Sequence, residues 1–273
     1  MRFNLNNKGI SFSKPPIQEV VYSLQFEPLN KFNLGHLGLI WDLYRADYPN
    51  VEQDDPIAHE IERFGSVGVA SARPNLQLFN RIPQPRIRLI QADGNSLIQA
   101  QNDHFVFNWR KHNSPDLEYP RYVNLKKQFE SELDKYLRFI DSEKLGEPLI
   151  NQVEVTNVNI IPADKRNFSD VFEGLSCGTD SSRDLTTEST MFQHRQVIMQ
   201  DESPIGRLYT SIETTHLLKD GSKVFRVQFI GRAHPKKPNK IEALSTMDLL
   251  RDYINRSFVG LTTESMHAEW GQE

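Results

Sequence analysis

Apolar residues recur along the chain at two spacings, every second position in some segments and every third or fourth in others. Residues 15–28 show the period of two and predict a strand. Its alternating apolar positions are Val20, Tyr22, Leu24 and Phe26. Residues 34–48 carry an apolar stripe at helical spacing between Asn33, which suits a helix N-cap, and Pro49. We therefore expect a strand and then a helix.

The rest of the first half predicts a polar loop, three strands and a long helix. Residues 50–65 are polar and acidic, which is typical of a loop. Strands are expected at 85–92, 96–101 and 104–109, and the Asp-Gly-Asn between the first two favours a hairpin. The longest helix is expected from Pro120, a good first-turn residue, to about Ser142.

The second half shows a similar order. Residues 152–162 predict a strand whose alternation slips near Asn157, which suggests a bulge. A short helix capped by Asn167 should follow. Further strands are expected at 191–200, 206–218 and 223–233. A long helix then closes this half, and its inward positions are predicted to be Ile241, Leu244, Met247, Leu250, Ile254 and Phe258.

The similar order of strands and helices in the two halves predicts an α+β fold. We expect two β-α-β-β-β-α units, each an antiparallel sheet covered by a long C-terminal helix. The first unit would comprise residues 1–148, and the second unit 149–273 with a short terminal helix. The sequence leaves open whether the halves form two sheets or share one.

The last segment contains Glu264 and His267, a Glu-x-x-His pattern that can place two metal ligands on one helix face. A paired site would need a second such pattern, and none occurs. Gly260 suits the position past a helix end, and Thr262 suits the cap of a further short helix. We therefore expect the segment to pack, with no metal and no cofactor bound.

Composition narrows the class of protein. The chain has 273 residues, 38% of them hydrophobic, which is ordinary for a globular protein. A net charge of -4 gives no general reason to expect a nucleic-acid binder. The single cysteine excludes an intrachain disulfide, and no apolar run has the length of a signal peptide or a membrane span. We expect a cytoplasmic protein without membrane contact.

Four motifs together resemble a sporadically distributed family of uncharacterised bacterial proteins of about this length. They read PPIQEVVYSLQFEP, RIRLIQADGNSLIQAQNDHFVFNW, VTNVNIIP and LRDYINRSFVGLTTESMHAEWG. The resemblance implies no catalytic residue. Scattered occurrence is typical of horizontally moved genes, including phage-defence and toxin–antitoxin components. Where the resemblance leads us to expect RYIN, the chain reads VTNVN (155–159), so any role of that arginine is absent here.

Four polar residues on the predicted strands of the second half are candidate ligand-binding residues. They are His194, Arg195, Glu213 and His216. On a curved sheet they would line a cleft under the long helix. The alternative is the solvated face of a half-exposed antiparallel sheet.

Residues 232–240 form a short basic segment that is a candidate nucleic-acid contact. Its basic residues are Arg232, Lys236, Lys237 and Lys240. Arg86 and Arg88 on the first hairpin would extend it. No aromatic residues are interleaved for base stacking, so a solvated loop is the alternative.

The polar loop 176–190 is the segment best suited to recognition of a partner, since loops of this length are commonly functional or disordered. It contains Cys177, for which no base is fixed by the sequence. Without a catalytic constellation, the sequence favours a protein that binds, most readily another protein, over an enzyme. The alternatives are a small-ligand or nucleotide-binding protein or enzyme that uses a cleft between sheet and helix, and a nucleic-acid contact through 232–240.

Overall fold

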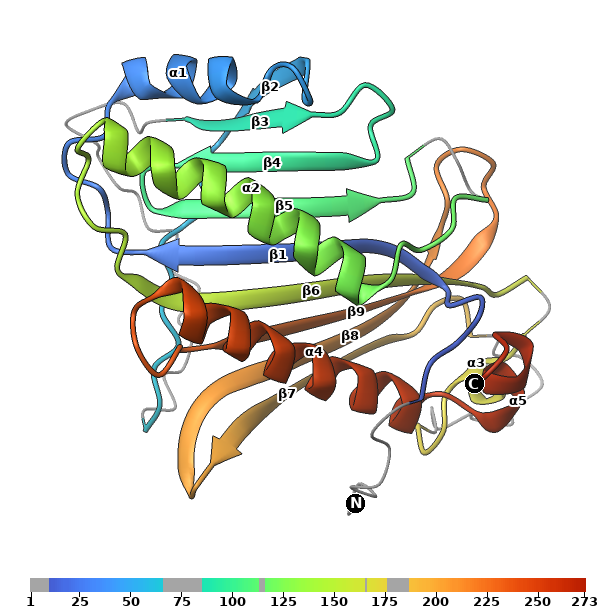
Figure 1. Ribbon diagram of the computed structural model, residues 1–273. Helices are drawn as coiled ribbons and strands as arrows, with labels where there is room; N and C mark the ends of the chain where they lie inside the picture. The colour runs from blue at the N-terminus through green and yellow to red at the C-terminus, as the bar shows by residue number, and fades with distance from the viewer. Residues whose placement is uncertain (1–9, 66–84, 113–115, 165, 176–186) are drawn as a thin grey trace.

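The computed structural model describes residues 10–65, 85–112, 116–164, 166–175 and 187–273. Within them the chain forms one antiparallel sheet of nine strands, with two long helices lying across one face (Figure 1). The strand order is β2-β3-β4-β5-β1-β6-β9-β8-β7. No helix in this described part of the chain has the length and apolar character needed to cross a membrane.

The strands arise largely where the alternation of apolar residues predicts them. The first half contains β1 (Ile17–Phe26), β2 (Asn50–Asp54), β3 (Arg86–Ile90), β4 (Ser96–Gln101) and β5 (His104–Arg110). The second contains β6 (Ile150–Pro162), β7 (Met191–Gln200), β8 (Ser203–His216) and β9 (Lys223–Ala233). The hairpin between β3 and β4 is confirmed, and Gly94 takes the positive φ of 75° that its turn requires. Strand β2 was not predicted, because its polar sequence lacks an apolar face.

Helices α2 (Tyr122–Ser142) and α4 (Lys240–Leu261) are the two long helices. Helix α1 (Leu34–Tyr44) packs beside α2, and its Tyr44 hydroxyl donates a hydrogen bond of 2.6 Å to the Glu132 carbonyl oxygen. The short helices α3 (Phe168–Val171) and α5 (Glu264–Glu269) lie together near the C-terminus (Figure 1). Asn33 caps α1 as predicted, since its side chain accepts from the Gly35 amide.

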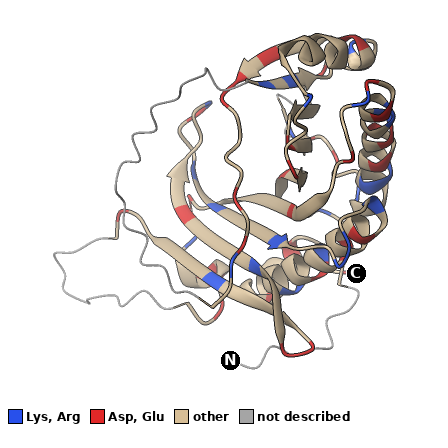
Figure 2. Cartoon of the chain, turned by 90° about the vertical axis from the view of Figure 1, so that its left-hand side faces the viewer, with Lys and Arg blue, Asp and Glu red and all other residues tan. Residues whose placement is uncertain are grey.

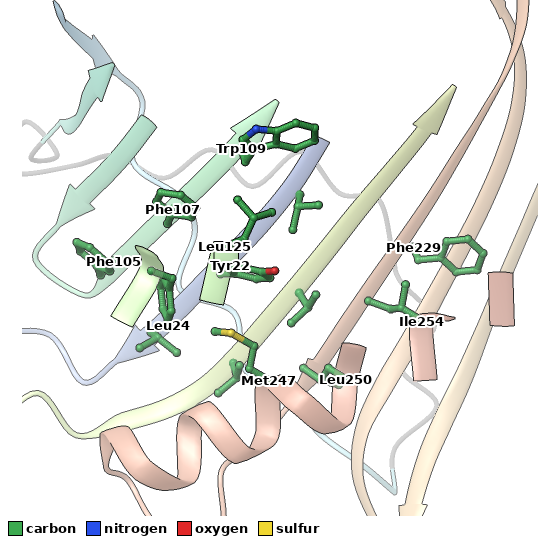
Figure 3. Packing of buried hydrophobic residues seen from close by; sticks show 14 of the residues in the cluster. Tyr22, Leu24, Phe105, Phe107, Trp109, Leu125, Phe229, Met247, Leu250 and Ile254 are labelled. Carbon is green, nitrogen blue, oxygen red and sulfur yellow. The ribbon is translucent and has the colours of Figure 1, made fainter. Parts of the chain in front are cut away.

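The core lies between the sheet and the long helices. Figure 3 shows its buried side chains, which come from strands of both halves and from α2 and α4. Aromatic rings fill the first half: the Tyr22 ring lies 5.6 Å from Phe129, and Phe105 stacks 4.9 Å from Tyr136. Burying such large rings is a major source of stability in a fold of this kind. One apolar layer therefore holds the sheet and both helices together.

The prediction of two sheets, each covered by its own helix, is wrong. Strands β1 and β6 pair antiparallel from Ile17–Asn159 to Phe26–Ile150, so one sheet continues through both halves. Each of these strands would otherwise leave a long row of backbone donors and acceptors unpaired in the middle of the molecule. The first half also has four strands between its helices, where three were expected.

Three local predictions also need correction. Asn157 stays in register with Val20 and with Phe229, and its side chain faces the helices; the register shift near it falls in β1, between Ile17 and Glu19 opposite Asn159 and Val158, and not in β6. Ile241 is 79% exposed, because α4 begins only one residue before it and has not yet reached the sheet. Helix α4 runs through Gly260, and Thr263, not Thr262, precedes α5 as its N-cap.

Candidate functional site

The face of the sheet opposite α2 and α4, called the open face below, is crossed by the chain itself. Residues 55–64, which we call the strap, run over it with few regular hydrogen bonds of their own. Gln101 accepts from the Ile57 amide at 2.8 Å, and Gln152 accepts from the Glu62 amide at 3.0 Å. Side chains of β4 and β6 therefore take the place of a neighbouring strand in satisfying the strap backbone.

Glu62 is the main anchor of the strap. Its carboxylate is buried, accepts a hydrogen bond of 2.6 Å from the Tyr209 hydroxyl and forms an ion pair with Arg207. His234 Nε2 lies 2.8 Å from the Glu62 carbonyl oxygen. Burial and the Glu62 hydrogen bond both raise the pKa of Tyr209, so this phenol remains a donor at neutral pH. The strap is thus fastened to β8 and β9.

A second anchor fastens the beginning of the strap to the β4–β5 turn. Asp103 lies between two histidine rings, with its oxygens 2.8 Å from His59 Nδ1 and 2.7 Å from His104 Nδ1. Burial alone would raise the pKa of Asp103, but hydrogen bonds from His104, Gln101 and His59 outweigh it and lower the pKa below its usual range. The charged carboxylate is therefore held in place.

A polar chamber of about 360 Å³ remains between the strap and the sheet. Its charged lining is balanced, with Glu60 and Glu154 against Arg86 and Arg232. Arg232 donates to Glu154 at 2.6 Å and lies over the Tyr209 ring. Burial lowers the pKa of Arg232, but Glu154 and the other neighbours of Arg232 raise it by more. The pKa of Arg232 therefore lies above its usual value, and the side chain stays charged. Arg232 pairs with both Glu154 and Glu60, which ties the strap to the sheet across the chamber, while Arg86 pairs with Asp54 of β2 outside it.

A shallow groove of about 450 Å³ lies beside the chamber, on the open face of β7, β8 and β9. Arg195 and Gln193 of β7 face Tyr209 and Ser211 of β8 across the strand pair. Arg195 is exposed and makes no ion pair or hydrogen bond within the part of the chain that the structure describes. It is therefore available to a partner, unlike Arg232 at the other side of the groove.

Strand β7 forms one edge of the sheet and has ten residues. Within the described ranges, only β8 pairs with it. Met191, Val197 and Met199 are 67%, 49% and 50% exposed. The strand contains no proline, lysine or acidic residue, and of the features that protect a sheet edge from pairing it has one charge, Arg195, and a register shift between Ile198 and Met199. Among the described residues, this edge is long, carries exposed apolar side chains and is not paired on its outer side.

The other edge strand, β2, is built differently. It has five residues, and its Glu52 and Asp54 form ion pairs with Arg88 and Arg86 of β3. A short strand with paired charges is a poor template for an added strand. The two edges of the same sheet thus differ in length, charge and apolar character.

The four predicted ligand-binding residues do not form one cluster. Arg195 and Glu213 lie on the open face, where Glu213 is opposite Met191. The other two are on the alternate positions of their strands: His194 is opposite Thr210 and exposed, and His216 is opposite Lys223 at the end of β8. No cleft under α4 brings the four together, and only His194 and Arg195 border the groove.

The predicted basic segment is also divided. Arg232 is committed to Glu154, and Lys240 forms an ion pair of 2.5 Å with Asp134 of α2. Lys236 and Lys237 are exposed on the loop. Figure 2 shows acidic and basic residues interspersed along the strands. Arg86 and Arg88, expected to extend the patch, are paired with acidic residues of β2.

Of the Glu-x-x-His pattern near the C-terminus, His267 packs into the core and Glu264 is exposed. His267 is buried, its Nε2 lies 2.8 Å from Thr262 Oγ1, and its ring lies 5.4 Å from Phe12. No group of three or more histidine, cysteine or acidic side chains within the described ranges is placed to hold a metal ion. Cys177, and most of the loop 176–190, lie outside the described residues.

Sequence reasoning missed the strap and the open edge. Glu62 carries no signal of burial, because an acidic residue in a polar run predicts exposure. The edge was detectable in part, since MFQHRQVIMQ contains no proline and only one charged residue, but its place in the sheet depends on the strand order. The chain matches no protein-family model, no curated protein and no solved structure.

Proposed function

We propose that the protein is a binding protein that recruits another polypeptide by strand addition to β7. The observation that carries this proposal is the ten-residue edge with exposed Met191, Val197 and Met199. Strand addition supplies affinity through backbone hydrogen bonds and specificity through alternate side chains. The proposal keeps the interaction role expected from the sequence and moves its site from the loop 176–190 to the edge.

The hydrogen-bond pattern supports an edge that is ready to pair. The Thr214 amide donates to the Thr190 carbonyl at 3.0 Å, just before β7 begins. Because bonding alternates along an antiparallel ladder, the odd-numbered residues from Met191 to Val197, before the register shift at Ile198 and Met199, direct their amides away from β8. Arg195 and Val197 are among them. Their side chains lie on the open face, beside the groove.

The charge of Arg195 argues against a second copy of this chain as the partner. Two β7 strands paired antiparallel about a two-fold axis would bring their central residues together, and Arg195 is one of the central residues. Like charges opposite each other destabilise a strand pair. An extended segment with an acidic residue opposite Arg195 and apolar residues beside Val197 fits the edge better.

The test uses variants that change the outer side of β7 and leave its pairing with β8 intact. Val197→Pro removes an outward amide, a position where an edge strand tolerates proline. Val197→Thr keeps the amide and the β-branched side chain. Arg195→Glu reverses the charge, with Lys237→Glu on the exposed loop as its matched control.

The tagged chain is purified from its native cells, and proteins bound to each variant are compared by quantitative mass spectrometry. We expect a partner captured by the wild type, Val197→Thr and Lys237→Glu and lost from Val197→Pro and Arg195→Glu. Addition of the purified partner should slow hydrogen exchange of the β7 amides. Capture that Val197→Pro leaves unchanged, or a wild-type chain that remains monomeric and alone, refutes strand addition.

A further inference from the structure

A separate cavity of about 380 Å³ lies on the helix side of the sheet. It is enclosed by β1, β6, the start of α2, the C-terminal half of α4 and the segment that precedes β1. That segment is anchored to the C-terminus, because the Ser13 amide donates to the Gly271 carbonyl at 2.8 Å. The cavity volume is at the small end of the range for sites that hold one small organic molecule.

The cavity has mostly apolar walls. They are formed by Phe12, Ile17, Val155, Ile254 and Phe258. All of these side chains are buried, and they come from three distant parts of the chain. Such a lining with a few convergent polar groups is characteristic of ligand pockets.

Tyr22 places an unsatisfied hydroxyl in this cavity. The residue is 1% exposed, lines the cavity, and its hydroxyl has no hydrogen-bond partner within the described residues. Figure 3 shows Tyr22 on β1 among apolar side chains of the core. Leaving a buried hydroxyl unpaired is costly, and phenylalanine would fill the same space without that cost. The hydroxyl therefore needs a partner that the described part of the chain does not supply.

Two further polar groups line the same space. The Asn157 side chain makes no hydrogen bond within the described chain, although it replaces the apolar residue expected at this position of β6. Arg251 of α4 lies over the Tyr122 ring, forms an ion pair of 3.0 Å with Asp252 and donates to the Asn255 amide oxygen, and its other guanidinium N–H groups remain as donors. Tyr22, Asn157 and Arg251 thus offer donors around one apolar cavity.

Charge indicates what these donors receive. The charged residues of the lining are Arg121, Arg251 and Glu273, an excess of one positive charge. Arg121 donates to the Phe12 and Ser13 carbonyls, and Glu273 accepts from the Ser11 hydroxyl. Arg251 forms an ion pair with Asp252, but its remaining N–H groups can still meet a bound carboxylate, with which guanidinium groups pair well.

We propose that this cavity binds a small monocarboxylic acid with an apolar body, whose carboxylate meets Tyr22, Asn157 and Arg251. The apolar part of the molecule lies against Val155, Ile254 and Phe258. This site is independent of the proposed partner edge, because it is on the other face of the sheet. The protein thereby has a ligand site in addition to a surface for another polypeptide.

Benzoate and octanoate are the probes, with benzamide and benzylamine as neutral and cationic analogues of benzoate. Binding to the full chain is followed by isothermal titration calorimetry and thermal unfolding. At least one carboxylate should bind saturably with one molecule per chain, and benzamide and benzylamine should bind more weakly. Loss of the Tyr22 hydrogen bond in Tyr22→Phe should weaken binding about tenfold, the effect of one hydrogen bond to a charged group.

Arg251→Gln should weaken carboxylate binding and reduce the preference over benzamide. Arg256→Gln, on the same helix but outside the cavity lining, is the matched control and should bind as the wild type does. Absence of saturable carboxylate binding at millimolar concentration overturns the proposal. Equal affinity of Tyr22→Phe and wild type also overturns it, because the molecule then binds elsewhere.

Discussion

The Tyr209 hydroxyl donates a hydrogen bond of 2.6 Å to Glu62, which joins the middle of β8 to the strap. Both residues are polar, and both lie on the face of the sheet that the long helices leave uncovered. The same carboxylate pairs with Arg207, and Arg232 lies 4.0 Å away. A single buried acid therefore balances charges from two strands.

Glu62→Gln should destabilise the fold by about 2–3 kcal/mol, because it leaves the half-buried Arg207 without its anionic partner. The strap should loosen at the same time. Chemical denaturation measures the loss of unfolding free energy. Hydrogen exchange of the strap amides measures the loosening.

Glu60→Gln is the matched control, since Glu60 is on the same strap and contacts Arg232 at 3.4 Å, but its side chain is 69% exposed. An exposed ion pair contributes less than about 1 kcal/mol, so this variant should keep nearly full stability. Equal losses in the two variants would contradict the role of Glu62 as the anchor.

Much of the fold is predictable from the sequence because apolar periodicity reflects burial directly. The alternation of Val20, Tyr22, Leu24 and Phe26 predicts β1, and the stripe from Leu125 to Ile140 predicts α2. The pairing of β1 with β6 is not predictable in this way. Either strand has a pattern that would allow it to pair with other strands. Their pairing with each other becomes evident only from the strand order of the complete sheet.

The strap anchor and the cavity are harder to predict, because their polar residues interrupt the periodicity of apolar residues. Glu62 is buried through ion pairing, and its sequence neighbours indicate a solvated loop. Asn157 interrupts the alternation of apolar residues in β6. The sequence suggests a bulge at this point, whereas the structure places the Asn157 side chain in the wall of a cavity. A polar residue at an apolar position is thus informative, but its meaning depends on what lies opposite.

His267 should make stability depend on pH in the weakly acidic range. Burial lowers the pKa of His267 and outweighs the carboxylates of Glu264 and Glu173, which raise it. Above the usual histidine pKa of about 6.5 the ring is neutral in both states, and its contribution is complete. As pH falls below that value the unfolded chain binds the proton more readily, so the contribution is lost.

We therefore expect the unfolding free energy to decrease between about pH 7 and pH 5, the range set by the usual histidine pKa. His267→Gln keeps a donor near Thr262 but cannot titrate, and should reduce the decrease. His194→Gln, at an exposed position, should leave it unchanged. Denaturation curves at several pH values check the slopes, and identical slopes in all three proteins would contradict the expectation.

Helix α4 approaches β9 closely at Gly231. A Cβ atom there would lie 3.1 Å from Leu250 Cδ2 and 3.6 Å from Ile254 Cδ1. Gly231→Ala should therefore cost about 1–3 kcal/mol, the usual effect of overpacking a core. Gly38→Ala in α1 meets nothing within 4 Å and should stabilise by about 0.5–1 kcal/mol through helix propensity. Thermal unfolding of the two variants should show shifts of opposite sign.

Two buried tyrosines should respond in opposite ways to loss of their hydroxyl groups. Tyr44 donates to the Glu132 carbonyl at 2.6 Å, so Tyr44→Phe should lose about 1 kcal/mol of unfolding free energy. The Tyr22 hydroxyl has no hydrogen-bond partner among the described residues, so Tyr22→Phe should leave stability unchanged or raise it, because an unpaired buried hydroxyl is removed. Urea denaturation without added ligand checks both. A destabilised Tyr22→Phe would mean that the chain itself satisfies the hydroxyl, and the cavity would then lack the unmet donor on which carboxylate binding depends.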